Sequence, residues 1–458
     1  MDLLVDLLNR FNNFIWGVPL PILLIGTGLY LTYKLRFIQV RKLILAIKYT
    51  LFPHEEKDAD GDISSFQALM IAMSGTVGTG NIIGVSLAIS MGGPGALFWM
   101  WLAGLIGMAT KYSEAMLGVK YRIKDEHGRM SGGPMYIWER GLNNRFMAIF
   151  YAVCGCLSAL TISAMVQTNS MVDILRLKFR IHPLLGGLSI ALIIAYIAYG
   201  GIKQNARMVT IVMPFVVTFF IIGSGIIILS HISLVPQAIA TIFKSAFDFS
   251  SATGGVLGSQ IAAAINHGVR RGLFSNEAGN GTAPIAAATA RTNSHCRQGL
   301  INMLDVFIDT HIINVLMGLL VVMSGAYEYV STPMELVTIS FSQSGSLASL
   351  GEITVTVCLI FFSFTTITAW LFYGEKCFSY LFGVKIKPYF KTLFIFSIIL
   401  GSTLQIDFIL LIADAALALA SIPSILSVLF LSSEVIKDTH EYMANHEQSS
   451  RSQSKVES

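Results

Sequence analysis

The chain has 458 residues, of which 54% are hydrophobic and only 13% are charged, with 31 basic and 27 acidic side chains. Soluble domains carry roughly 25% charged residues, so this composition excludes a soluble globular enzyme, a disordered chain and a secreted disulfide scaffold. The net charge of +4 is too small to predict nucleic-acid binding. We therefore expect an all-α polytopic membrane protein embedded in a lipid bilayer.

About eleven stretches are candidates for transmembrane helices, because a helix needs about 20 apolar residues to cross the hydrocarbon core. The turn MGGPG at 91–95 separates two spans within 63–110, and three charged residues interrupt the span at 249–290. The others lie at 11–33, 146–172, 181–202, within 208–243, within 300–327, and at 353–374, about 387–405 and about 406–431.

The distribution of basic residues predicts the orientation of the chain. An odd number of spans places the two termini on opposite sides of the membrane. With the N-terminus outside, 22 of the 31 basic residues fall in inside loops and the tail, and five fall outside, as the positive-inside rule requires. The N-terminal sequence MDLLVDLLNR does not resemble a cleaved signal. We predict an integral protein of a prokaryotic plasma (inner) membrane, with the N-terminus outside and the C-terminus cytoplasmic.

The arrangement of apolar and polar stretches divides the chain into three parts. Residues 1–62 are predicted to form an extra transmembrane helix and a cytoplasmic loop, and residues 63–431 a core of ten helices. Residues 432–458 are polar, with Ser and Gln, and are predicted to be a disordered cytoplasmic tail.

Two core spans contain glycines and polar residues near their middle: GTVGTGN at 75–81, the first break, and GLFSNEAGNGTAP at 272–284, the second break. Each glycine weakens a helix by about 1 kcal/mol relative to alanine. Non-helical backbone at this depth is tolerated only where it is buried in protein or lines a cavity. The breaks fall in the first and sixth core spans, which predicts two five-helix halves of inverted topology, the architecture of leucine-transporter-like secondary transporters. Tight helix packing at the glycines is the alternative.

The sequence resembles the alanine or glycine:cation symporter family at these two breaks and beyond. The resemblance runs from 26–39 to near Pro423 and implies a leucine-transporter-type fold with sodium-coupled uptake of small neutral amino acids. Asn280 and Thr282 stand where Met and Ser are usual in that family, and Cys296 stands where proline is common. The stretch GIKQNARMVTIVMPF lacks the usual acidic residue before the proline. The matching motifs are GTVGTGNIIGVSLAI, GGPGALFWMW, GMATKYSEAMLGVKYR, SGGPMY, GVRRGLFSNEAGNGTAP and QGLINMLDVFIDT.

An amino-acid zwitterion needs partners for both of its charges, because neither can be left unpaired in an apolar interior. Backbone N–H groups, hydroxyls and a helix N-terminus at the first break suit the carboxylate, and carbonyls at the second break suit the ammonium. Gln167 is a candidate polar wall of the pocket or an interhelical hydrogen bond, and Phe274 and Trp370 are candidates to narrow the pocket or to pack in the core. The predicted substrate residues are Thr76, Gly78, Thr79, Gly80, Asn81, Gln167, Gly272, Phe274, Ser275, Asn276 and Trp370.

Sodium is the expected coupling ion, and no other cofactor is expected. Paired carboxylates are absent from the first break and from the eighth core span, so hydroxyls and carbonyls must supply the ligands. In the related fold, the eighth core span faces the first break and completes a sodium site. The alternative is that these hydroxyls bond to their own helix. The predicted sodium residues are Ser74, Val77, Ser363, Thr365 and Thr366.

Several ionisable residues lie within the predicted spans. Lys111 and Glu114 are spaced i,i+3 and can pair on one helix face. Asp305 and Asp309 are spaced i,i+4, so they share a face and need a counter-charge or a proton. Asp414 has no evident partner. We favour a structural network for these residues over a role in gating or coupling.

The leading hypothesis is a sodium-coupled symporter that takes up alanine, glycine or serine by alternating access. The alternative is a symporter of the same fold that uses protons or carries another small solute. An enzyme is disfavoured because no nucleophile has a partnering base: His267 and Ser275 lie eight residues apart across a predicted break. A channel is disfavoured because rings of pore-lining charge are absent. The enantiomer, the sodium stoichiometry and the oligomeric state are not predicted.

Overall fold

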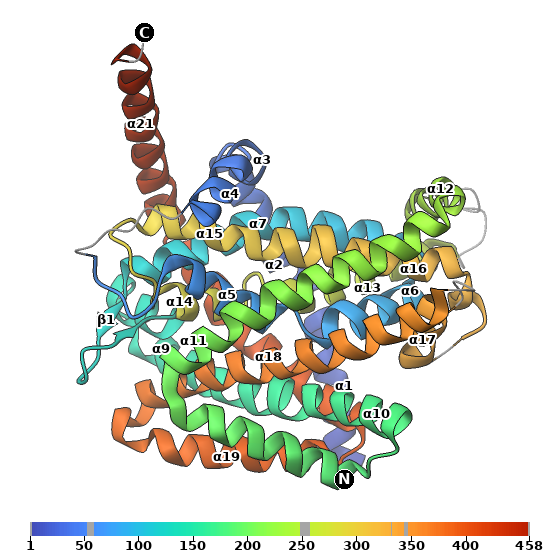
Figure 1. Ribbon diagram of the computed structural model, residues 1–458. Coiled ribbons are helices and arrows are strands. Elements are labelled where there is room, and N and C mark those ends of the chain that lie inside the picture. The colour runs from blue at the N-terminus through green and yellow to red at the C-terminus, as the bar shows by residue number, and fades with distance from the viewer. Residues whose placement is uncertain (1, 53–58, 248–256, 331, 343–346, 457–458) are drawn as a thin grey trace.

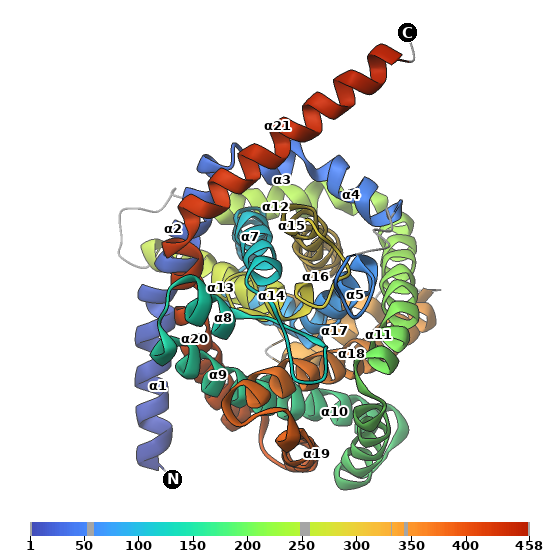
Figure 2. The same ribbon diagram turned by 90° about the vertical axis from the view of Figure 1, so that its left-hand side faces the viewer.

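The computed structural model describes residues 2–52, 59–247, 257–330, 332–342 and 347–456. Most of these residues are helical, and most helices run side by side along one direction (Figure 1). Figure 2 looks down this direction and shows α7 and α15 end-on in the bundle.

The N-terminal half contains the helices that precede the longest helix of the chain. A two-stranded antiparallel hairpin of β1 (Ile123–Lys124) and β2 (Met130–Ser131) pairs Ile123 with Ser131. The helices are α1 (Asp2–Gly17), α2 (Pro19–Lys34), α3 (Ile38–Arg41), α4 (Leu43–Leu51), α5 (Ser65–Thr76), the π-helical η1 (Gly80–Gly84), α6 (Val85–Gly92), α7 (Gly95–Lys120), α8 (Pro134–Tyr136), η2 (Ile137–Gly141), α9 (Arg145–Ser158), η3 (Ala159–Gln167) and α10 (Thr168–Phe179).

The C-terminal half begins with the longest helix and ends with a helix beyond the predicted core. Its helices are α11 (Pro183–Ser230), η4 (Ile232–Leu234), α12 (Val235–Phe247), α13 (Leu257–Asn276), α14 (Thr282–Ala287), α15 (His295–Val306), η5 (Phe307–Asn314), α16 (Val315–Ser324), η6 (Ala326–Glu328), α17 (Pro333–Ser342), α18 (Ala348–Phe382), η8 (Val384–Ile386), α19 (Lys387–Gly401), α20 (Ile406–Phe430) and α21 (Ser432–Val456).

Seven helical segments of the described chain are long and apolar enough to cross a membrane, or eight if the bent pair formed by α5 and η1–α6 is one span. The helices α7 and α13 carry buried polar groups, and α19 has only 15 residues. The length and composition of the described helices identify seven or eight spans. The predicted number of eleven therefore stays a prediction.

The apolar stretch at 11–33 falls within one candidate span, Val5–Lys34. Within it, α1 ends at Gly17 and Pro19 begins α2, which fits the preference of proline for the first turn of a helix. Figure 2 shows α1 side-on at the edge of the bundle, so it lies across the direction of α7. The stretches at 181–202 and 208–243 correspond to two candidate spans, Pro183–Gly200 and Ile202–Ser230, both within α11.

The region 432–458, predicted to be disordered, contains α21, and its first turns pack against the bundle. The hydroxyls of Tyr112 and Thr439 share a buried hydrogen bond of 2.8 Å. The ammonium of Lys120 lies 2.5 Å from a carboxylate oxygen of Asp438, and Tyr121 donates to Glu434 at 2.7 Å. The prediction of disorder therefore does not hold for the start of α21.

Glycines allow close packing of helices, both at the second break and between α2 and α7. A Cβ atom added at Gly118 of α7 would lie 2.4 Å from the Cα of Pro284 in α14, so only glycine allows these two helices to approach this closely. A Cβ added at Gly28 of α2 would lie 2.5 Å from Cγ2 of Ile106 in α7 and 3.2 Å from the Ile106 carbonyl oxygen.

We predict that Gly28→Ala destabilises the protein while Gly26→Ala does not. Overpacking at Gly28 should cost about 1–3 kcal/mol, because the new methyl group meets Ile106. Gly26 lies on the same helix, is exposed, and has no atom within 4 Å of an added Cβ, so alanine there should be neutral or stabilising. Thermal unfolding in detergent measures both variants. Equal melting temperatures for the two variants would contradict the packing of α2 on α7.

Candidate functional site

At the first break, side chains satisfy backbone groups that the helix leaves without partners. The helix α5 ends at Thr76 and resumes at Gly80 with a bend of 52°. Between them, the N–H of Gly78 donates to Oδ1 of Asn81 at 2.8 Å, and the N–H of Thr79 donates to Oε1 of Gln167 at 3.2 Å. The structure therefore brings the predicted Gln167 to the break, where its amide oxygen takes the place of a helical carbonyl.

The helix α18 faces the same break from the other side. The hydroxyl of Thr366 donates to the carbonyl oxygen of Val77 at 3.2 Å and to that of Phe362, one turn earlier in α18, at 2.8 Å. A Cβ added at Gly78 would lie 2.7 Å from this hydroxyl. A threonine oxygen and an unwound carbonyl, both predicted sodium ligands, are therefore neighbours.

The other predicted sodium residues are placed differently. The hydroxyl of Ser74 donates to Ile71 at 2.9 Å, and that of Thr365 donates to Phe361 at 2.9 Å, so both bond to their own helix. The hydroxyl of Ser363 is buried and has no hydrogen-bond partner among the described residues. Sodium binding by this set stays a prediction, carried by Val77 and Thr366.

The second break is held by a carboxylate from α7. Residues Glu277, Gly279 and Gly281 have positive φ of 54°, 95° and 85°, so the chain between α13 and α14 is not helical. The carboxylate of Glu114 accepts the N–H groups of Gly279 and Gly281 at 3.0 and 2.9 Å and the hydroxyl of Ser424 at 2.9 Å. The loop geometry thus depends on an acceptor from another helix.

Glu277 itself turns toward two donors. Its carboxylate accepts the indole N–H of Trp370 at 3.0 Å and the hydroxyl of Thr282 at 2.7 Å. Trp370 is therefore bound to the second break. Thr282 stands where the resembling family usually has serine. Threonine adds a methyl group and keeps the hydroxyl that donates to Glu277.

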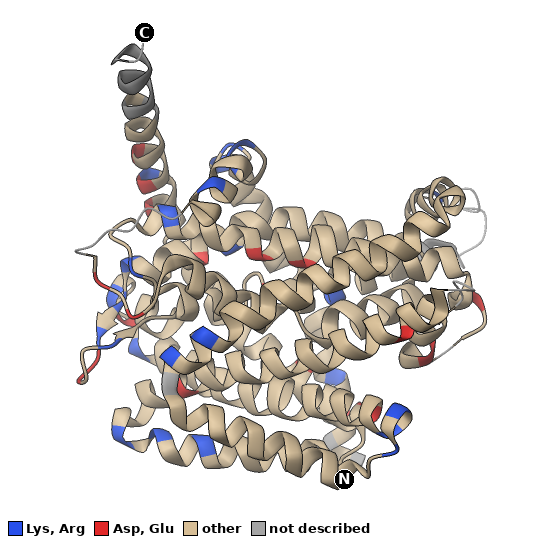
Figure 3. Ribbon diagram, in the orientation of Figure 1, with Lys and Arg blue, Asp and Glu red and all other residues tan. Residues whose placement is uncertain are grey.

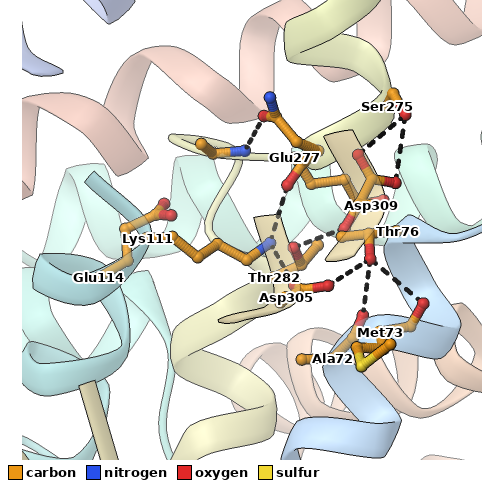
Figure 4. Close-up of polar contacts among 12 residues, drawn as sticks. Ala72, Met73, Thr76, Lys111, Glu114, Ser275, Glu277, Thr282, Asp305 and Asp309 are labelled. Atoms are coloured by element: carbon orange, nitrogen blue, oxygen red, sulfur yellow. Dashed lines mark hydrogen bonds and ion pairs between the residues drawn. The ribbon is translucent and has the colours of Figure 1, made fainter. Parts of the chain in front are cut away.

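One ion pair joins the two breaks (Figure 4). The ammonium of Lys111 lies 3.0 Å from Oδ2 of Asp305 and donates to the carbonyl oxygen of Asn276, at the end of α13, at 3.0 Å. The hydroxyl of Thr76, at the end of α5, donates to Oδ1 of Asp305 at 2.6 Å. Lys111 thus pairs with Asp305 and not with Glu114, its expected partner.

Asp309, one turn further along, contacts both breaks through neutral side chains. It accepts from Nδ2 of Asn81 at 2.5 Å, from the hydroxyl of Ser275 at 3.2 and 3.1 Å, and from Thr310 at 2.8 Å. Asn314 completes the group by accepting from Asn81 at 2.9 Å and donating to Ser275 at 3.1 Å. Sequence reasoning missed Thr310 and Asn314, although both are polar residues within the same apolar span as the aspartates.

A cavity of about 280 Å³ lies beside the two breaks. Three predicted substrate residues, Thr79, Gly80 and Phe274, line it. The guanidinium of Arg271 lies over the Phe274 ring, 5.7 Å from the ring centre. Polar residues that sequence reasoning missed as pocket residues also line it: Asn169, Ser170, Asp173, Arg271 and Asp407. Asn169, Ser170 and Asp173 follow Gln167 by less than two helical turns, which is the signal that could have found them.

The remaining predicted substrate residues lie behind this cavity. Thr76, Asn81 and Ser275 bond to the two aspartates, and the carbonyl of Asn276 bonds to Lys111. A Cβ added at Gly272 would lie 3.1 Å from Cγ of Met100, so that residue packs against α7. The cavity residues do not include Gly78, Gln167 or Trp370.

Asp414, which had no evident partner, forms an ion pair. Nη2 of Arg270 lies 2.5 Å from Oδ2 of Asp414. The guanidinium lies 5.5 Å from the centre of the Trp16 ring, and the Trp16 indole donates to the Asp414 carbonyl at 3.1 Å. The pair connects α13, α20 and α1.

Comparisons with known proteins agree on one family. The model of the sodium:alanine symporter family matches residues 1–456. The sodium/alanine symporter AgcS of Methanococcus maripaludis is 40% identical over 440 residues, which are 95% of this chain and 96% of that protein. An uncharacterized transporter of Haemophilus influenzae is 43% identical over 95% of this chain and 96% of its own length. The probable sodium/glutamine symporter GlnT of Bacillus subtilis is 33% identical over 96% of this chain and 91% of its own length.

A solved structure shares the fold. The crystal structure of MhsT in complex with L-phenylalanine aligns with a TM-score of 0.58 over 83% of this chain and 99% of that chain. At 14% identity, the likeness concerns the fold alone, which is the leucine-transporter-type arrangement predicted from the two breaks.

We predict that Lys111→Met destabilises the protein by about 3–5 kcal/mol, because it leaves the buried carboxylate of Asp305 without a counter-charge. Adding Asp305→Asn should recover much of that loss, since the remaining amide is neutral. Thermal unfolding of the two single variants and the double variant measures the coupling energy. Additive losses in the double variant would contradict the ion pair.

Proposed function

Because the chain belongs to the sodium:alanine symporter family, we propose that it takes up small neutral amino acids, namely alanine, glycine or serine, together with sodium. The protein is an integral membrane transporter and not an enzyme. The observation that carries the proposal is the contact between the Thr366 hydroxyl and the unwound Val77 carbonyl, next to the cavity-lining Thr79.

The cavity supports a small zwitterion as the substrate. Its volume of about 280 Å³ lies just below the range of roughly 300–1,000 Å³ that is usual for ligand pockets. It presents groups of both signs, the guanidinium of Arg271 and the carboxylates of Asp173 and Asp407, which matches a molecule with one charge of each sign. Phe274 restricts the space for a substrate side chain.

The contacts at the first break support sodium as the coupling ion. Hard cations prefer oxygen ligands, and Val77 and Thr366 supply a carbonyl and a hydroxyl oxygen at 3.2 Å from each other. The buried Ser363 hydroxyl, which lacks a hydrogen-bond partner in the described chain, adds an uncommitted oxygen on α18. We assign the sodium site to these three residues.

The position of the cavity fits the proposed orientation, with the N-terminus outside. Lys and Arg residues gather at the left-hand end of the bundle (Figure 3). The cavity residues Asp173, Pro333 and Asp407 come from the middle of α10 and the starts of α17 and α20. The α10 end precedes a segment predicted to lie outside, so the cavity faces the side from which substrate enters.

Uptake by the reconstituted protein tests the proposal. Labelled alanine should accumulate in vesicles under an inward sodium gradient, and excess glycine or serine should compete. A proton gradient alone should not drive uptake. Uptake that is driven by a proton gradient and does not depend on sodium would favour a proton-coupled carrier. Accumulation of glutamine but not of alanine would indicate that the substrate is glutamine, as the name of the GlnT relative suggests for that protein.

We predict that Thr366→Ala weakens the apparent sodium affinity by roughly 10- to 150-fold, since a lost hydrogen-bonding or ligand group to a charge is worth about 1.5–3 kcal/mol. Thr366→Ser keeps the hydroxyl and should restore the affinity. Thr210→Ala is the matched control, because its hydroxyl bonds only to Ala206 on its own helix. An unchanged sodium dependence in well-expressed Thr366→Ala would remove this residue from the site.

A further inference from the structure

A second cavity lies at the end of the bundle opposite to the cavity at the breaks. It has a volume of about 420 Å³ and shares no lining residue with the cavity at the breaks. Its lining comes from the segment before α5, the β1–β2 hairpin, α11 and the residue Arg291 after α14. The hairpin lies at the left-hand end of the bundle in Figure 1, whereas α10 and α17, which line the cavity at the breaks, lie at the right-hand end.

Backbone hydrogen bonds hold together two walls of this second cavity. The N–H of Asp62, before α5, donates to the carbonyl oxygen of Thr289, after α14, at 2.9 Å. The N–H of Arg291 donates in return to the carbonyl oxygen of Ile63 at 2.7 Å. A Cβ atom added at Gly61 would lie 2.2 Å from the Cα of Arg291, so only glycine allows the two segments to approach this closely.

Three side chains hold the hairpin against these two segments. Oδ2 of Asp62 accepts the N–H of Met130 at 3.0 Å, and the ammonium of Lys376 donates to the Met130 carbonyl oxygen at 2.5 Å. The guanidinium of Arg122, next to β1, donates to the carbonyl oxygen of Ala290 at 2.6 Å. The walls are therefore already in place before any ligand binds, which lowers the entropic cost of binding.

The side chains that line the cavity carry an excess of positive charge. In the described part of the chain, four basic residues line it, namely His127, Arg129, Lys203 and Arg291. Their side chains form no hydrogen bond or ion pair with any other described residue. The carboxylate of Asp62 also lines the cavity, but it already accepts the Met130 N–H. Figure 3 shows Lys and Arg residues gathered at this end of the bundle.

This arrangement of charge is suited to a phosphate group. Clefts lined by one sign of charge concentrate the opposite sign, and the planar guanidinium donates two parallel hydrogen bonds to phosphate oxygens. A phosphate monoester carries a charge of roughly −1.5 to −2 at pH 7, which the ammonium and the two guanidinium groups can balance. The volume of about 420 Å³ lies within the range of roughly 300–1,000 Å³ that is usual for ligand pockets, so the cavity has room for an organic group on the phosphate.

We propose that this second cavity binds the phosphate group of a phosphate monoester through Arg129, Lys203 and Arg291. The monoester is a soluble metabolite or the head group of an anionic lipid, because both present the same group and basic pockets between membrane helices bind such head groups. A bound phosphate links the hairpin, α11 and the segment after the second break. The site is separate from the cavity at the breaks, so it does not depend on the proposed substrate or coupling ion.

Calorimetric titration of the purified full-length protein in a neutral detergent tests the site with two probes. Glycerol 3-phosphate is the soluble probe, and short-chain phosphatidic acid in mixed micelles of the same detergent is the lipid probe. The wild type should bind at least one of them, with one molecule per chain. Arg291→Gln should weaken this binding about ten-fold, because it removes a charged donor, and the fold should be retained because the backbone N–H of residue 291 still reaches Ile63.

Arg207→Gln is the matched control. Arg207 is exposed and lies about one helical turn from Lys203 on α11, but it does not line the cavity. Its substitution should leave the affinity unchanged. Lys203→Gln provides the same comparison if Arg291→Gln is not monodisperse.

The two probes distinguish the sources of the phosphate group. Binding of glycerol 3-phosphate alone would support a soluble metabolite, and binding of phosphatidic acid alone would support a lipid head group. The site would be overturned if the wild type bound neither probe. It would also be overturned if Arg291→Gln and Arg207→Gln weakened binding equally, because the attraction would then come from the general positive charge of this end of the protein.

Discussion

The structure depends on one constraint: backbone groups released from a helix inside a bilayer must find partners within the protein, because the hydrocarbon offers none. Each break obeys it with side chains from other helices. Gln167 accepts the N–H of Thr79 at the first break, and Glu114 accepts those of Gly279 and Gly281 at the second. The helices α7 and η3 are therefore fixed around the breaks by these bonds as well as by apolar packing.

This constraint accounts for the location of the few charges inside the bundle. Lys111 donates to the last carbonyl of α13, and its charge is balanced by Asp305, which accepts from the last hydroxyl of α5. A charged residue is thus used where a strong donor or acceptor must reach an unwound backbone. The protein can have a polar centre although only 13% of its residues are charged. The few charged side chains inside the bundle, such as Lys111 and Asp305, contact the two breaks.

Sequence reasoning was most successful where the signal is local. Glycine-rich polar segments within apolar spans located both breaks, and the resemblance predicted the family and the fold that the comparisons confirm. It failed where partners are distant in sequence. The i,i+3 spacing suggested Lys111 with Glu114, but Asp305, 194 positions away, lies closer to the ammonium. The sequence also does not show which side of a break faces the cavity. Thr79 and Asn81 were therefore both predicted to bind substrate, although of the two only Thr79 lines the cavity. The search for charge-free stretches found the span that the structure has at Val5–Lys34, but it did not show that one helix ends at Gly17 and the next begins at Pro19 within it.

The same contacts restrict how the transporter can change conformation. Thr76 and Asn276 end the first halves of the two broken helices, and the Lys111–Asp305 pair holds both ends. Asn81 and Ser275, on either side of the breaks, are joined through Asp309. The two breaks can therefore move together with α7, α15 and η5 at little cost to these bonds, whereas moving apart would remove hydrogen bonds to buried charges. Rigid-body motion of the paired broken helices, rather than independent bending of each, is the form of alternating access that this arrangement favours.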